Sequence, residues 1–360
     1  MASIIDYAMQ GSRIFLSSVK SRLAPKKYTG NDKEICHQVI KDCWNGRYFQ
    51  TSTTNFPQFW TRDFGWCVQS LLKLGYEKEV QQTLRYAINR FKAENKITTT
   101  ITPGGKPFDF PTMSVDSLPW LIHSIRLSHF DFHPFIPFLE KEIKKYFKQV
   151  ISPNTGLVNP EKKFSSIKDF AVRKSSCYDN CMVGLLSQDL TKLRLYNPFK
   201  DYDYPDLIKR HFWNGKYFYD DLTKQDYVAG DANVFPFVLG MCTDKEMLQS
   251  ALTAIADAEL DVPLPLKYTA ERKNVKFIWQ EVFLKDYESD AIWTHLGPLY
   301  IRLLQQVNKE KALTLKNNYK KKIEKHKNYL EVFSAPGQPY RSAFYSSDRG
   351  MLWAANYLTL

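Results

Sequence analysis

The sequence predicts an all-α protein, an (α/α)6 toroid of six helical hairpins that carries small β-hairpins in its loops. Three observations lead to this prediction: apolar side chains recur at helical spacing along most of the chain, the alternation typical of strands is almost absent, and short connections alternate with long ones. Val80, Leu84 and Phe91 illustrate the helical spacing. The twelve helices of such a toroid are expected near residues 32–44, 64–75, 78–93, 115–128, 134–150, 179–193, 204–212, 232–241, 244–259, 290–306, 309–330 and 348–358.

The connections between these helices differ in length. Residues 75–77 form a short link, whereas residues 94–114, 151–178 and 260–289 form long ones. Long loops in a compact domain usually carry function. We therefore expect any binding or catalytic site to be built from these loops.

A short motif occurs twice in the chain. The segment Trp44–Phe49 is echoed by Trp213–Phe218, and each contains an Asn-Gly pair at the same place. Asn-Gly is typical of a tight two-residue turn. The repeat predicts two small hairpins on one face of the toroid.

The organisation of the chain favours one large domain. No stretch rich in Gly, Pro or Ser divides its 360 residues, so we expect an N-terminal extension over residues 1–30 and a single catalytic domain over residues 31–360. No run approaches the roughly 18 apolar residues of a membrane-spanning helix, and Met1–Lys27 lacks the apolar stretch of a secretory signal. We expect a cytoplasmic protein with no membrane partner, as a monomer or small homo-oligomer.

The formal charge of +12 raises the question of nucleic acid. Much of the excess lies between Lys316 and Lys327, where Leu315, Tyr319 and Ile323 recur at helical spacing and lysines take most other positions. This pattern is typical of a solvated lysine face on an amphipathic helix. We therefore expect no nucleic-acid partner.

The cysteines do not indicate a metal site. They form no CxxC pair and have no histidine at the spacing of zinc ligands. We expect most of them to be unpaired and buried as small apolar side chains. The six are Cys36, Cys43, Cys67, Cys177, Cys181 and Cys242.

The long loops are aromatic and acidic, a composition suited to sugars, because aromatic rings stack on sugar C–H faces and carboxylates bind hydroxyls. In Phe59–Phe64, at the start of an expected helix, Arg62 and Asp63 stand beside Trp60. This group can hold sugar hydroxyls by charge-assisted hydrogen bonds. The alternative is that Asp63 caps the helix and pairs with a neighbouring cation.

Three more acidic residues fall where helices begin: Asp116 in Ser114–Trp120, Asp179 in Ser176–Cys181 and Asp231 in Gly230–Phe237. Asp116 and Asp179 are candidates for acid catalysis, and Asp231 for binding a further hydroxyl. Each has the same alternative, because Asp is a favoured N-cap residue.

Glu331 is expected at the end of the helix over 309–330, where the helix dipole disfavours a negative charge. Such a placement favours a catalytic role. Trp293 and His295 are expected to shape the pocket, although His295 can equally be a packing histidine.

Several of these segments resemble known glycosidases. Trp60–Asp63 resembles the W-x-R-D motif of glucoamylases, and with Val115–Ser117 and Trp120 it is similar to the paired segments of neutral/alkaline invertases and debranching-enzyme glucosidase domains. Leu330–Phe333, followed by Gly337 and Trp353–Leu358, resembles the acidic motif and closing helix shared by those families and the glucosylglycerate hydrolases. Ile292–Pro298 is similar to their aromatic, Gly-containing loop.

The resemblance implies an (α/α)6 barrel and an inverting glycosidase that needs no cofactor or metal. Inversion requires an acid and a base whose carboxyl groups lie roughly 6.5–9.5 Å apart. Glu331 matches the general base of every family named. The acid falls at Asp116 in invertases and debranching glucosidases, and near Asp179 in glucoamylases and glucosylglycerate hydrolases. The separation from Asp63 slightly favours Asp179, and both remain candidates.

The sequence therefore predicts a glycoside hydrolase that acts on the end of a short glycoside or oligosaccharide by paired-carboxylate catalysis. The alternatives are a sucrose or α-glucan hydrolase of invertase or debranching type, and a catalytically inactive sugar-binding toroid. The last alternative rests on departures from the motifs. The acid motif of glucoamylases is absent, and Ser334–Pro336 stands where an Asp is common.

Overall fold

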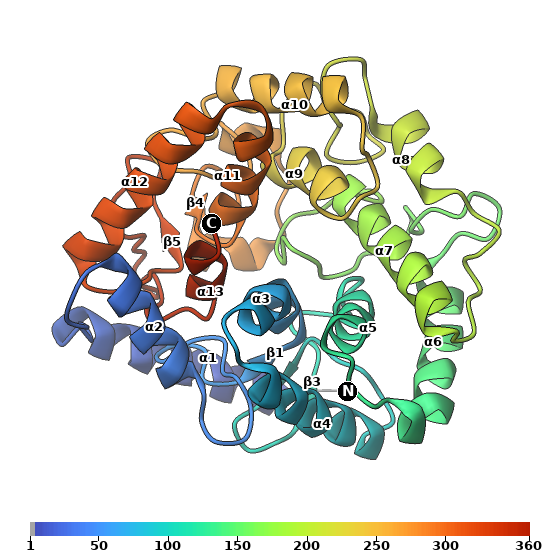
Figure 1. The fold of residues 1–360 in the computed structure, drawn as a ribbon, viewed down its shortest axis with the longest axis horizontal. Helices are drawn as coiled ribbons and strands as arrows, with labels where there is room; N and C mark the ends of the chain where they lie inside the picture. Colours follow the sequence, from blue (N-terminus) through green and yellow to red (C-terminus); the bar gives the residue numbers. More distant parts are fainter. Residues whose placement is uncertain (1–3) are drawn as a thin grey trace.

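The computed structural model describes residues 4–360. Within this range an inner ring of helices is closed, because each contacts the next and the last contacts the first (Figure 1). The inner helices are α3 (Thr61–Lys73), α5 (Ser117–Ser128), α7 (Cys177–Leu193), α9 (Gly230–Val238), α11 (Leu296–Val307) and α13 (Ala354–Leu358). The predicted all-α toroid is confirmed.

Six further helices surround this ring and alternate with the inner ones along the chain (Figure 1). They are amphipathic, with one face packed on the ring and the other in solvent. The outer helices are α2 (Asp32–Cys43), α4 (Glu77–Ala93), α6 (Ile136–Val150), α8 (Tyr204–Phe212), α10 (Lys245–Asp257) and α12 (Lys309–His326).

Close packing between inner helices depends on small residues. A Cβ atom on Gly65 of α3 would lie 2.7 Å from the Cβ of Trp120 on α5. Glycine at this position lets the two helices approach until the indole lies against the α3 backbone. The cysteines behave as expected in this packed interior, since all six are unpaired and all except the half-buried Cys242 are buried.

Three predicted helix boundaries are wrong in ways that affect the site. Helix α11 begins at Leu296 instead of residue 290, and α13 begins at Ala354 instead of residue 348. Helix α12 ends at His326, because Lys327 adopts the left-handed conformation with φ 50°. Glu331 therefore does not end a helix, and the dipole argument for it does not hold.

A two-stranded sheet lies next to the shortened ends of α11 and α12. Strand β4 (Ile292–Trp293) pairs antiparallel with β5 (Val332–Phe333), which places Glu331 at the start of a strand. A second sheet is formed by β1 (Phe59–Trp60), β2 (Thr100–Ile101) and β3 (Pro107–Phe108). Three 3₁₀ helices complete the described elements, η1 (His133–Phe135), η2 (Arg272–Asn274) and η3 (Trp279–Leu284).

The repeated motif forms the two expected hairpins. Trp44 bridges Phe49 and Trp213 bridges Phe218, in each case directly after an outer helix. The side chain of Asn45 accepts hydrogen bonds from two backbone N–H groups of the following turn, and Asn214 repeats this arrangement.

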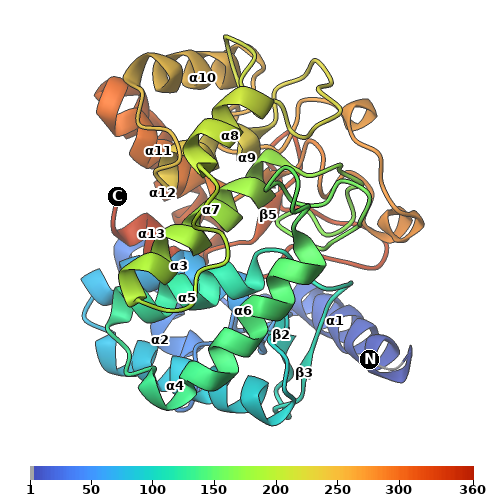
Figure 2. The same ribbon diagram turned by 90° about the vertical axis from the view of Figure 1, so that its right-hand side faces the viewer.

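The N-terminal segment forms a helix that the sequence did not predict, α1 (Ile4–Leu23). It lies outside the ring, on the same side as β2, β3 and the long loops (Figure 2). Arg13 fixes it by donating to the carbonyl of Asn55 and to the side chain of Gln58, both at 2.8 Å. None of the helices in residues 4–360 is long and apolar enough to cross a membrane.

Candidate active site

A cavity of about 140 Å³ opens on the face of the ring that carries the long loops. All three long loops contribute to it, through Phe110, through Ile167, Asp169 and Phe170, and through Leu284, Tyr287 and Glu288. The other lining residues are Ile14, Thr51, Phe56, Trp60, Arg62, Asp63, Trp66, Trp293, His295, Glu331, Tyr345, Met351 and Trp353. The expectation that the site is built from these loops agrees with this arrangement.

One wall of the cavity comes from the start of α3. Asp63 lies in the first turn of this helix and accepts a hydrogen bond from the indole N–H of Trp353 at 3.1 Å. It does not cap α3, because the N-cap residue is Trp60 and no side chain caps the helix. Burial raises the pKa of Asp63 to about 7.

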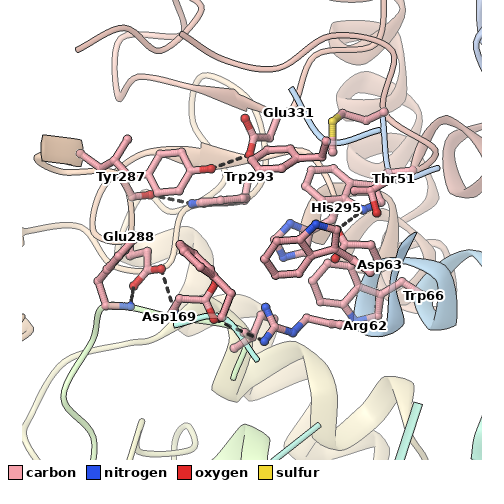
Figure 3. Close-up of a pocket in the computed structure, with 18 of the residues that line it drawn as sticks. Thr51, Arg62, Asp63, Trp66, Asp169, Tyr287, Glu288, Trp293, His295 and Glu331 are labelled. Carbon is pink, nitrogen blue, oxygen red and sulfur yellow. Dashed lines mark hydrogen bonds and ion pairs between the residues drawn. The ribbon is translucent and has the colours of Figure 1, made fainter. Parts of the chain in front are cut away.

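Aromatic rings form the floor of the cavity (Figure 3). The imidazole of His295 stacks on Trp66 with centroids 4.2 Å apart and planes 8° from parallel. Burial lowers the pKa of His295 well below its usual value, so the ring is neutral. Its Nδ1 and the indole N–H groups of Trp60 and Trp66 are buried and have no partner among the described residues. Three buried polar groups beside the cavity are therefore unsatisfied in this structure.

Glu331 faces the cavity from the opposite side, at the start of β5 (Figure 3). Oε1 accepts from the hydroxyl of Tyr287 at 2.5 Å, and Oε2 accepts from the hydroxyl of Tyr345 at 2.5 Å and from the backbone N–H of Asp348 at 3.0 Å. Among the described residues no cation pairs with it. Burial, together with the nearby Asp348 carboxylate, raises the pKa of Glu331 to about 8.

Two further carboxyl groups, those of Asp169 and Glu288, line the cavity. The sequence did not indicate either residue. Glu288 accepts the backbone N–H groups of Asp169 at 2.7 Å, Phe170 at 2.8 Å and Ala171 at 3.1 Å. Glu288 thus holds the Asp169 loop against the loop that carries Tyr287 (Figure 3). The length of these two loops was the one signal in the sequence that pointed to them.

The side chain of Asp169 is less enclosed than that of Glu288. Oδ1 of Asp169 accepts from the Ser165 hydroxyl and lies 3.5 Å from the guanidinium of Arg62, while Oδ2 has no hydrogen-bond partner in the described chain. The side chain is 18% exposed. Burial raises the pKa of Asp169. Burial, together with the neighbouring carboxylate of Asp169, raises the pKa of Glu288 to about 8. Two neighbouring buried carboxyl groups disfavour each other's ionised form.

Of the residues singled out in the sequence, Trp60, Arg62, Asp63, Trp293, His295 and Glu331 lie together on the cavity wall. The other three, Asp116, Asp179 and Asp231, do not line it.

Asp116 and Asp231 are held in ion pairs behind the cavity. Asp116 accepts from Arg62 Nε at 2.5 Å and from the hydroxyl of Tyr178 at 2.9 Å. Asp231 lies 2.9 Å from the Lys168 ammonium and 3.0 Å from the Arg173 guanidinium. Neither carboxyl group caps its helix, so the capping alternative is wrong for both.

Asp179 lies in the first turn of α7, where the Ser176 side chain caps the helix and accepts the N–H of Asp179 at 3.1 Å. The capping alternative is therefore wrong for Asp179 as well. Burial raises the pKa of Asp179 to about 6, although the nearby Arg173 acts against this.

Comparisons with known proteins identify the fold. No family model matches the sequence, and no curated protein matches it. Solved structures do match. A rhamnosidase from Klebsiella oxytoca with rhamnose bound superposes with a TM-score of 0.63 at 10% identity over 93% of this chain, and this chain spans 64% of the length of that one.

Two other structures match over nearly their whole length. A glycosidase variant in complex with glucose gives a TM-score of 0.65 at 10% identity, covering 98% of this chain and 96% of its own. A GH63 mannosylglycerate hydrolase from Thermus thermophilus in complex with glucose gives 0.59 at 9% identity, covering 92% and 100%. The chain therefore has the six-hairpin toroidal fold found in these glycosidases.

Proposed function

We propose that this protein is an inverting glycoside hydrolase that removes a terminal sugar from a short glycoside. The observation that carries the proposal is the cavity itself, where Glu331 faces Asp169 and Glu288 across a floor of aromatic rings (Figure 3). Inverting hydrolysis needs one protonated and one ionised carboxyl group on opposite sides of the scissile bond. The fold neighbours with bound rhamnose or glucose support a single sugar unit as the group that is held.

Glu331 is the proposed general base. Two tyrosine hydroxyls and one backbone N–H donate to its oxygens, an arrangement that orients the carboxylate and stabilises its ionised form against burial. In this role Glu331 takes a proton from water while the water oxygen attacks the anomeric carbon.

Asp169 is the proposed general acid, in place of Asp179 and Asp116. Its side chain lines the cavity, its Oδ2 has no hydrogen-bond partner in the described chain, and burial raises its pKa. The carboxyl group of Asp116 is instead engaged by Arg62 and Tyr178 behind the cavity wall. Asp169 protonates the glycosidic oxygen as the bond to the leaving group breaks.

The remaining polar groups suit a sugar. The Asp63 carboxyl group accepts hydroxyl hydrogens, while the unpartnered N–H groups of Trp60 and Trp66 donate to hydroxyl oxygens. The flat faces of Trp293 and Trp353 add apolar contact for the C–H surface of the ring. Asp231 is not part of this binding proposal.

The test is hydrolysis of a panel of chromogenic glycosides and natural disaccharides, with the configuration of the product read by proton NMR. We expect Glu331→Gln and Asp169→Asn each to lower kcat by about 10²–10⁴-fold, the usual contribution of a general acid or base. Asp179→Asn is the matched control, because it makes the same change to a buried Asp outside the cavity, and it should remain within about tenfold of the wild type.

Two results would reject the mechanism. Unchanged turnover in Glu331→Gln removes this residue from catalysis. A product of retained configuration rules out inversion. If Asp179→Asn loses activity and Asp169→Asn does not, the acid is Asp179.

A further inference from the structure

Four exposed aromatic rings form a continuous row on the face of the molecule that carries the cavity. Phe15 of α1 lies with its centroid 6.5 Å from Phe344, Phe344 lies 5.3 Å from Phe283, and Phe283 lies 6.2 Å from Trp279. Three segments far apart in the sequence thus meet in one surface. We call these four residues the aromatic rim.

The aromatic rim adjoins the mouth of the cavity at three points. Ile14, Leu284 and Tyr345 line the cavity, and each is the direct chain neighbour of a rim phenylalanine: Phe15, Phe283 and Phe344 respectively. The three segments that carry the rim phenylalanines therefore also contribute to the cavity wall.

The rim is exposed and has little polar character. Trp279 is 72% exposed and Phe344 is 51% exposed, and two aliphatic neighbours, Leu16 and Val282, are 66% and 69% exposed. Three of the four rim side chains are phenylalanines, which carry no hydrogen-bonding atom, and the indole N–H of Trp279 is the one polar group of the rim. The rim therefore offers few of the partners that sugar hydroxyls require. Contiguous exposed apolar surface of this kind usually marks a binding site.

Hydrogen bonds hold the segments of the rim together. The hydroxyl of Ser342 donates to the carbonyl of Phe283 at 2.9 Å, and the hydroxyl of Tyr340 donates to the carbonyl of Lys285 at 2.7 Å. Arg22 of α1 donates to the carbonyl of Tyr345 at 2.8 Å. The rim is therefore a built surface that keeps its shape without a ligand.

We propose that the aromatic rim binds an apolar leaving group, so that the substrates of the cavity are glycosides of an alkyl or aryl alcohol. The proposal rests on the function proposed above, in which the terminal sugar occupies the cavity. A sugar held there directs its glycosidic oxygen toward the opening, and the group attached to that oxygen then lies along the rim. The reaction adds the water oxygen to the anomeric carbon, breaks the bond to the glycosidic oxygen and releases the alcohol with the proton that the acid supplies.

The test measures dissociation constants of n-alkyl glucosides from methyl to octyl, in both anomers and below the concentrations at which they form micelles. Burial of a methylene group strengthens binding by about fourfold at most. Octyl glucoside has four more methylene groups than butyl glucoside. We expect it to bind at least about tenfold more tightly, which is well below the maximum that full burial of all four groups would give. The ratio depends on the alkyl chain, so it does not require glucose to be the preferred sugar.

Rim and control variants identify where the chain binds. The double variant Phe283→Ala and Phe344→Ala should reduce the octyl-to-butyl ratio to about threefold or less. The matched control is Leu313→Ala, an apolar side chain that is 60% exposed on the outer helix α12, and it should keep the full ratio. Affinity that does not change with chain length, or a ratio that survives in the double variant, overturns the proposal.

Two further measurements test the proposed hydrolysis and the source of the apolar group separately. Glu331→Gln should lose turnover and keep the chain-length dependence, so full activity in this variant would reject the proposed function while leaving the rim assignment intact. Co-sedimentation with phosphatidylcholine vesicles distinguishes the source of the apolar group. Binding that the double variant abolishes indicates a glycoside presented by a lipid surface, and no binding to vesicles, with the ratio retained, indicates a free alkyl or aryl glycoside.

Discussion

The protein has two neighbouring groups of buried carboxylates, and their surroundings shift the pKa values in opposite directions. Around the cavity, Glu331 and Glu288 are held by hydroxyl or backbone N–H groups and have pKa values raised by burial to about 8. Behind the cavity, the Asp220 carboxylate lies near both Lys168 and Arg173. Burial alone would raise the pKa of Asp220, but these two cations lower it below its ordinary value.

The difference shows how the same residue type can serve structure or chemistry. A buried carboxylate with a cation at contact distance stays ionised and fixes two segments together. A buried carboxyl group without one has a raised pKa, which suits it to exchange a proton with a substrate or with water. Burial is common to both groups, so the placement of lysine and arginine separates Glu331 and Glu288 from the structural carboxylates. Asp169, whose Oδ1 lies 3.5 Å from the Arg62 guanidinium, is intermediate between the two groups.

The largest expected effect on stability comes from removing a cation behind the cavity. In Lys168→Met the carboxylates of Asp220 and Asp231 lose the ammonium that contacts both. Breaking a buried ion pair from one side costs about 3–5 kcal/mol, so the free energy of unfolding in urea should fall by this amount. Lys320→Met, on the exposed face of α12, should change it by less than about 0.5 kcal/mol. An equal effect of both substitutions would contradict the comparison.

A smaller effect on the free energy of unfolding is expected from the Glu331 carboxyl group, and it depends on pH. The pKa of Glu331 is about 8 in the folded protein and near the ordinary glutamate value of 4.5 in the unfolded chain, so the folded state binds more protons between these values. Stability should therefore decrease as pH rises from about 5 to about 8. Each unit of raised pKa is equivalent to about 1.4 kcal/mol, and we expect a loss of at least about 2 kcal/mol.

Glu331→Gln checks this effect, because glutamine does not titrate. Unfolding of the wild type and the variant in urea, followed at several pH values, should show a shallower decrease for the variant. Equal slopes would mean that Glu331 has an ordinary pKa in the folded protein.

The smallest expected effect is a shift in the pH dependence of activity. The Tyr345 hydroxyl donates to Glu331 and stabilises its ionised form, so Tyr345→Phe should raise the pKa of Glu331 further. The base acts only when ionised, and the ascending limb of kcat/KM against pH should move upward by about one unit. In the control Tyr340→Phe, a hydroxyl that donates to the carbonyl of Lys285 is lost, and the limb should not move.

Most helices of the fold could be predicted from the spacing of apolar residues, because inner and outer helices both bury apolar faces at helical spacing. The same reasoning located Trp60, Arg62 and Asp63, since they stand directly before or within the first turn of α3. The start of an inner helix points to the loop face of the ring, so local sequence was sufficient to place these side chains.

At the starts of α5 and α9, the surroundings of the acidic side chains depend on residues that are distant in the sequence. Asp116 and Asp231 are drawn into ion pairs with Arg62, Lys168 and Arg173, which lie tens of residues away along the chain. Asp169 and Glu288 lie in irregular loops, where no periodicity indicates which way a side chain points. Loop length pointed to the segments that line the cavity, and only the tertiary path of the backbone shows which of their side chains face it.

The closure of the ring by α13 has a consequence for how the protein becomes active. Asp63 receives its hydrogen bond from Trp353, a residue 290 positions away, and the ring is complete only when α13 packs on α3. Joining residues at such separation has a large loop-closure entropy cost that local helical contacts do not have, so we expect this contact to form after most helices. A folding intermediate that retains most of its helices would therefore still lack a formed cavity, and turnover would report completion of the last step of assembly.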